Sequence, residues 1–133
     1  MVCIYCGGKT HITNSRRQRR SNTTWRRHHC TLCDTVFTSI EAADYSKHIT
    51  VRSSHNDETA FSRDRLLLSL HKSLQHRPNP LSDAIGLCET VVNNVGQQSK
   101  QGILQSSDIR TTVIKILQRF DKLAAQYYSA LHP

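Results

Sequence analysis

The stretch "CIYCGGKTHITNSRRQRRSNTTWRRHHCTLC", residues 3–33, begins and ends with a Cys-x-x-Cys pair and carries six arginines. Two such pairs separated by 23 residues have the spacing of a zinc ribbon, in which two tight turns each present two thiolates to one tetrahedral ion. The sequence therefore predicts one structural zinc ion per chain, bound by Cys3, Cys6, Cys30 and Cys33.

Two other uses of these residues are possible. A single Cys-x-x-Cys pair can be a redox motif, but such motifs begin a helix, whereas glycines and polar residues follow Cys6. His28 and His29 precede Cys30, and either could replace a cysteine as a metal ligand. Because adjacent residues of a strand point to opposite faces, at most one of them faces the metal. The simpler interpretation is a polar strand surface.

The residues around the cysteines favour a three-stranded β-ribbon. Segments 10–15, 23–29 and 35–40 are rich in Thr, Ile, Val and aromatic residues, which favour strands. The arginine-rich segment 16–22 between the first two is polar and suits an exposed turn or loop. A segment this short buries too little apolar area to fold alone, so zinc would supply about 10 kcal/mol or more of its folding free energy.

The positive charge of the chain is concentrated in this ribbon. Residues 1–33 contain seven Lys and Arg and no Asp or Glu, whereas the rest of the chain has 11 basic and 10 acidic residues. Arginines without carboxylate partners repel one another unless an anion such as phosphate neutralises them, and their guanidinium groups also bind guanine edges. An ordinary solvated surface is the alternative. We predict nucleic-acid contacts from Arg16, Arg17, Arg19, Arg20, Trp25, Arg26 and Arg27. Composition alone does not distinguish DNA from RNA.

The rest of the chain reads as a small, mainly helical domain. We place the domain boundary at 45/46, giving domains 1–45 and 46–133. Segment 47–52 is a predicted strand, followed by a hairpin or loop. Helices are predicted from Ser62 to about residue 75, from Ser82 to near Gly96, and from Ser107 to Phe120; residues 121–133 either continue the last helix or form a fourth. The fold class is therefore α+β, a zinc β-ribbon followed by helices and a small β-hairpin.

Several classes of protein are disfavoured. The sequence has no Gly-x-Ser-x-Gly, no Walker loop and no His-Glu-x-x-His, so we expect a binding protein rather than an enzyme. No apolar run approaches the roughly 20 residues that span a bilayer, and the first residues lack the regions of a signal peptide. We expect a cytoplasmic protein without a membrane partner. Cys88 reads as a small buried apolar residue.

The order of these modules resembles the NrdR family of bacterial transcriptional repressors of ribonucleotide reductase genes, which join a zinc ribbon to an ATP-cone. In the ribbon, the resemblance rests on "CIYC", "THITNSR", "WRRHHCTLCDTVFT" and Glu41. In the helical half it rests on "FSRDRLLLSLHKSLQHRP" and "FDKLAAQYYSAL". Together these motifs run along nearly the whole chain.

The resemblance implies a regulator whose ribbon binds paired operator repeats in double-stranded DNA. It also implies an ATP-cone-like domain that binds ATP or dATP and sets the state of a homo-oligomer in the bacterial cytoplasm, at the nucleoid. It assigns nucleotide binding to Val51, Arg52 and Arg65. The chain departs from the family in having Ile4 where proline is usual, and in lacking a glycine in "TVRSSHNDETAF", where backbone amides would approach phosphate.

Two hypotheses from other classes stay open. The basic ribbon alone also fits a zinc-ribbon protein that binds RNA or associates with the ribosome, although this does not explain the helical half. A third hypothesis is an allosteric module that docks on a reductase, which would bind that enzyme and not DNA.

Overall fold

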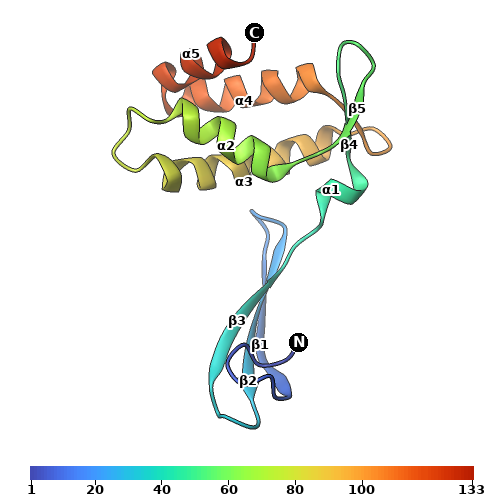
Figure 1. Ribbon diagram of the computed structural model, residues 1–133, viewed down its shortest axis with the longest axis vertical. Helices are drawn as coiled ribbons and strands as arrows, with labels where there is room; N and C mark the ends of the chain where they lie inside the picture. The colour runs from blue at the N-terminus through green and yellow to red at the C-terminus, as the bar shows by residue number, and fades with distance from the viewer. The chain divides into compact units, whose positions relative to one another are not determined.

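The computed structural model describes residues 1–133, which form two compact units, Met1–Ala43 and Asp44–Pro133. Figure 1 shows a unit built of strands and a unit built mainly of helices. The predicted α+β class is confirmed. No helix has the length and apolar character needed to cross a bilayer.

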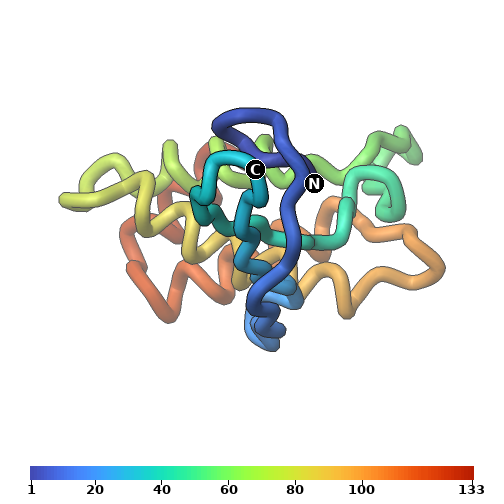
Figure 2. Tube along the Cα trace, turned by 90° about the horizontal axis from the view of Figure 1, so that it is seen from below, coloured from blue at the N-terminus to red at the C-terminus, as the bar shows by residue number.

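The N-terminal unit is an antiparallel ribbon of β1 (Thr10–Gln18), β2 (Thr23–Cys30) and β3 (Val36–Glu41), in the order β1-β2-β3. Figure 2 shows the dark-blue turn of the first cysteine pair beside the cyan turn that follows β2. The prediction of a turn over 16–22 is wrong in part, because Arg16 and Arg17 lie in β1 and pair with Trp25 and Thr24 of β2. The turn is limited to residues 19–22, where Asn22 adopts φ 50°, a left-handed conformation that asparagine tolerates.

The ribbon has almost no hydrophobic core. Its buried apolar side chains are Cys3, Cys30 and Phe37, and two of these three are cysteines. Most of the β1 surface is exposed to solvent. A unit of this size and composition depends on something other than apolar burial for its stability.

The C-terminal unit combines a short sheet with a group of packed helices. Its elements are α1 (Tyr45–His48), β4 (Thr50–Arg52), β5 (Glu58–Ala60), α2 (Arg63–Ser73), α3 (Pro80–Gln98), β6 (Ile103–Gln105), α4 (Ser106–Phe120) and α5 (Lys122–Leu131). The sheet has the order β5-β4-β6, with β4 antiparallel to β5 and parallel to β6. Its core is formed by apolar side chains of the sheet and the helices, with Leu70, Val91, Val113 and Leu117 completely buried.

Some predicted boundaries in this unit are wrong. Lys47 and His48, predicted in a strand, belong to α1, whose first turn is capped by the Asp44 carboxylate. The helix α3 begins at Pro80 rather than Ser82, since proline is favoured in the first turn. It also continues past Gly96 to Gln98. A Cβ at Gly96 would lie 3.0 Å from Cε1 of Tyr45, so the glycine allows this ring to pack against the helix.

The last two helices are separate, because Asp121 interrupts the chain between them with an extended backbone. Its Oδ1 atom accepts hydrogen bonds from the amides of Leu123 and Ala124, which caps α5. Its Oδ2 atom accepts from His76 Nε2 at 2.9 Å and from Arg77 Nη1 at 3.0 Å. The carboxylate therefore ties the α2–α3 loop to the α4–α5 junction.

These contacts predict how acid destabilises the helical unit. The hydrogen bond from His76, the Ala124 amide and Arg77 hold the pKa of Asp121 well below its ordinary value. A lowered folded-state pKa gives stability that is complete above the unfolded value of about 3.9 and is lost as the pH falls below it. We expect Asp121→Asn to lower the Tm at neutral pH by about 5 °C or more, with a difference that shrinks in acid.

Thermal unfolding followed by helical circular dichroism across a pH series measures this effect. Asp108→Asn is the matched control, since Asp108 likewise lies at the N-terminal end of a helix, α4, but is exposed. Equal decreases in Tm for the two variants at neutral pH would show that the hydrogen-bond network of Asp121 adds no stability of its own.

Candidate functional site

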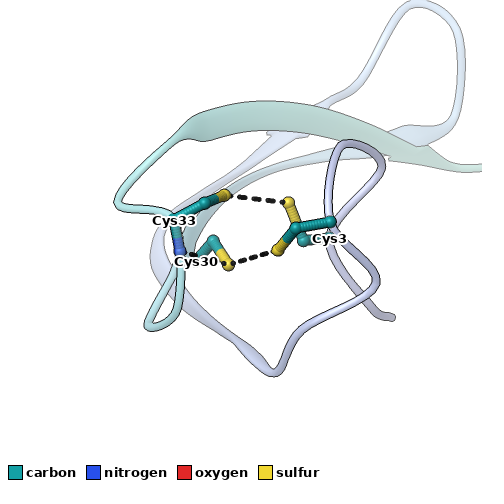
Figure 3. Close-up of side chains that lie close together, drawn as sticks. Cys3, Cys30 and Cys33 are labelled. Atoms are coloured by element: carbon teal, nitrogen blue, oxygen red, sulfur yellow. Dashed lines mark hydrogen bonds between the residues drawn. The ribbon is translucent and has the colours of Figure 1, made fainter.

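The four cysteines of the ribbon converge on one point. Their sulfur atoms all lie within 4.8 Å of one another. Cys3 Sγ lies 3.6 Å from Cys33 Sγ, and Cys6 Sγ lies 3.5 Å from Cys30 Sγ; Figure 3 shows Cys3, Cys30 and Cys33 at this point. Four thiolates at the usual Zn–S distance of about 2.3 Å would have sulfur separations of about 3.8 Å. The cluster therefore has the donors and the spacing for one tetrahedral zinc ion.

The backbone of both turns supports the sulfurs. The amides of Tyr5 and Gly8 donate to the sulfurs of Cys3 and Cys6, each at 3.4 Å, and the Leu32 amide donates to Cys30 Sγ at 3.4 Å. Such bonds orient a thiolate and offset part of its negative charge. Gly7 has φ 72°, which closes the first turn at a conformation that glycine adopts without strain.

The thiols have unequal proton affinities. Desolvation raises the pKa of Cys3. Hydrogen bonds from the Tyr5 and Cys6 amides and from Thr35 lower it by more than this, so the resulting pKa is about 6. The Gly8 amide lowers the pKa of Cys6, but hydrogen bonding with the Cys33 and Cys30 sulfurs raises it to about 12. Thiols this close cannot all ionise without a cation. Metal binding would therefore release protons, and its affinity would increase with pH.

The two histidines beside Cys30 have other partners. His28 Nε2 lies 2.7 Å from Ser39 Oγ, and its ring stacks on Phe37 with 5.0 Å between centroids. His28 is buried, so its interpretation as a polar strand surface is wrong. His29 Nε2 lies 2.6 Å from Asp34 Oδ1. Neither histidine belongs to the group of side chains placed to hold a metal ion.

The arginines of the ribbon occupy both faces of the sheet and its first turn. Arg16 and Arg17 are on β1, Arg26 and Arg27 are on β2, and Arg19 and Arg20 are in the turn between these strands. Trp25 lies between Arg16 of β1 and Ile40 of β3 in the strand register. The prediction brought these residues together on one ribbon but did not divide them between its faces.

One of the arginines has an acidic partner that sequence reasoning missed. Arg26 Nη1 lies 2.7 Å from Glu41 Oε2. The prediction treated the arginines as lacking any carboxylate partner, because it considered only acids within residues 1–33. The strand register accounts for this ion pair. Arg26 pairs with Ser39, and Glu41, two residues after Ser39, points to the same face of the sheet.

In the helical unit, two of the three predicted nucleotide-binding residues line one pocket. Val51 and Arg65 border a cavity of about 180 Å³ together with Phe61, Ile109 and Tyr128. The third residue, Arg52, is instead held by Glu58, whose Oε1 lies 2.6 Å from Arg52 Nη2 and 3.0 Å from Arg52 Nε. The pocket is smaller than the roughly 300 Å³ usual for a whole ligand.

Comparison with known proteins finds relatives that are named as transcriptional repressors. No family model matches it. A protein of Finegoldia magna named transcriptional repressor NrdR is 26% identical over 133 residues, covering 99% of this chain and 87% of that protein. A Streptococcus pneumoniae protein of the same name is 29% identical over 136 residues, covering 99% of this chain and 83% of that protein. The resemblance noted from the motifs is confirmed.

Proposed function

Because the chain is a homologue, along nearly its whole length, of the transcriptional repressors named NrdR, we propose that it is a zinc-dependent DNA-binding repressor. The observation that carries the proposal is the basic ribbon closed by four convergent cysteines. The zinc ion has a structural role, since four protein thiolates leave no open position for a substrate. The basic surface supplies contacts to DNA phosphates and base edges.

We propose that the regulated genes are those of ribonucleotide reductase, as the resemblance to the family implies. A single ribbon covers few base pairs, so a symmetric homo-oligomer would read repeated half-sites. Such a repressor acts in the bacterial cytoplasm at the nucleoid. As a repressor it would act by binding DNA rather than by catalysis.

We further propose that the helical unit senses ATP or dATP at the pocket beside Arg65. Arg65 is exposed in the first turn of α2, where the helix dipole and a guanidinium both favour a phosphate group. The cavity of about 180 Å³ accommodates part of a nucleotide, with the remainder outside it. The nucleotide controls DNA binding only if it binds one oligomeric state more tightly than another.

A DNA titration tests the proposal. Zinc-loaded protein is titrated with duplexes from upstream of ribonucleotide reductase genes and with scrambled duplexes of equal length, at a fixed salt concentration. We expect selective binding to the upstream duplexes. Salt-dependent binding that favours RNA without sequence preference would instead support the RNA hypothesis, and binding to a reductase without binding to DNA would support the docking hypothesis.

The same titration with added ATP or dATP tests the sensor. We expect nucleotide to change the affinity for the upstream duplex in the wild type and in Lys72→Ala, but not in Arg65→Ala. Lys72 is a matched control because it is an exposed cation on the same helix and does not line the pocket. Selective DNA binding that no nucleotide changes would retain the repressor and contradict the sensor.

A further inference from the structure

Strand register divides the ribbon into two faces. One face, here the tryptophan face, carries Arg16, Trp25 and Ile40 in one row across the three strands, and next to them Arg27 with Thr38. Because successive side chains along a strand point to opposite faces, the residues between these form the other face, here the cysteine face. Its members include Arg17, Arg26, His28, Cys30, Phe37 and Glu41.

The two faces differ in how open they are. On the cysteine face, His28, Cys30 and Phe37 are buried, so the half of this face nearest the metal site is covered. On the tryptophan face, Arg16, Arg27 and Thr38 are exposed, and Ile40 has 69% of its surface in contact with solvent. In the strand register, Ile40 lies directly beside Trp25, so the two side chains form a small apolar strip next to the exposed arginines of this face.

The faces also differ in charge. The ribbon has two acidic residues, Asp34 and Glu41. Glu41 lies on the cysteine face and neutralises Arg26, which is only partly exposed. Asp34 follows the second cysteine pair and contacts His29. This contact lies at one end of the tryptophan face, and Trp25 lies at the other end. Of the ribbon arginines in strands, only Arg26 has an ion pair, so the charges of Arg16 and Arg27 are available to an anion. Arg17 on the cysteine face also has no ion pair, but it lies in one row with Glu41 across Thr24.

We infer that the ribbon docks on DNA through its tryptophan face alone, with Arg16 and Arg27 on the phosphates and with Trp25 and Ile40 making apolar contact with the DNA beside them. Arg26, although adjacent to Arg27 in the sequence, stays on the far face in its pair with Glu41. This inference rests on the proposed DNA-binding function. It names which basic residues of the ribbon carry that function and which do not.

The sequence offers a closely matched pair of variants for the test. Arg26→Ala and Arg27→Ala each remove one positive charge from neighbouring positions of β2. Binding of the full-length, zinc-loaded proteins to a labelled duplex of mixed sequence is measured over a series of KCl concentrations. We expect Arg27→Ala to weaken binding on the order of tenfold and to reduce the slope of log K against log[salt] by about 1. Arg26→Ala should change the affinity less than about threefold and leave the slope unchanged.

A second pair on β1 repeats the contrast. Arg16→Ala removes charge from the tryptophan face, and Arg17→Ala removes it from the cysteine face, where Glu41 lies beyond Thr24 in the register. Zinc content and circular dichroism identify any variant that fails to fold. Equal losses within both pairs, or larger losses for Arg17 and Arg26, would overturn the face assignment. If the wild-type protein binds no duplex even at low salt, the proposed function itself fails.

Discussion

Removal of zinc by a chelator is expected to unfold the ribbon and leave the helical unit folded. The apolar core of the ribbon comprises Cys3, Cys30 and Phe37, whereas the helical unit has a continuous core of its own. Structural zinc contributes about 10 kcal/mol or more to the folding of comparable small domains, which exceeds what such a ribbon could gain from apolar burial. Affinity for DNA should be lost together with the metal.

Trp25 is the only tryptophan in the chain and lies in the ribbon, so its fluorescence reports this unit selectively. During a chelator titration we expect Trp25 fluorescence to change while the helical circular dichroism signal stays nearly constant. Zinc added back in excess should restore the fluorescence. A simultaneous loss of both signals would show that the two units do not fold independently.

Two cysteine variants provide the matched control for this experiment. Cys30 and Cys88 are both completely buried, but only Cys30 belongs to the sulfur cluster. We expect Cys30→Ala to abolish stoichiometric zinc binding and give the fluorescence of the metal-free protein. Cys88→Ala should keep one zinc ion per chain, since Cys88 is packed in the helical core. Zinc content measured by atomic absorption distinguishes the two results.

The second large effect is expected from Leu70→Ala in the core of the helical unit. Leu70 is completely buried on α2, so its truncation removes apolar contacts and leaves a cavity that costs about 2–5 kcal/mol. Leu68→Ala is the matched control, because Leu68 lies on the same helix with 60% of its surface exposed. Its truncation should change stability by less than about 0.5 kcal/mol.

Urea unfolding, monitored by the circular dichroism of the helices, measures the free energy of unfolding of both leucine variants. The chelator response of Trp25 fluorescence should be the same in both leucine variants, because Trp25 lies in the other unit. If Leu68→Ala destabilises the protein as much as Leu70→Ala, then the exposed side of α2 is covered by something in solution, such as a second copy of the chain.

Features with strong local signals could be predicted from the sequence. The cysteine spacing indicated which side chains would converge, and the leucine pattern placed α2 within a few residues of its bounds, Arg63–Ser73. The break between α4 and α5 could not be decided from periodicity, since apolar residues continue through it. It depends on contacts of Asp121 with His76 and Arg77, which are distant in the sequence.

Other features were missed because no local pattern marks them. The strand β6 has three residues and follows Gly102 with φ 77°, so neither length nor alternation distinguishes it from a loop. Its parallel pairing with β4 joins Thr50 to Ile103. The division of the arginines between two faces needed the strand register, because a side-chain period of two gives no information until the partner strands are aligned.

The parallel pairing of β4 with β6 also determines the order in which the chain can fold during synthesis. All strands and cysteines of the ribbon are complete by Glu41, so this unit can bind its metal while the rest of the chain is still being made. The sheet of the second unit must wait for Ile103–Gln105, and pairing of such distant segments is intrinsically slow. A nascent chain would therefore present all the metal ligands and strands of the ribbon before the residues that complete its second unit have been made.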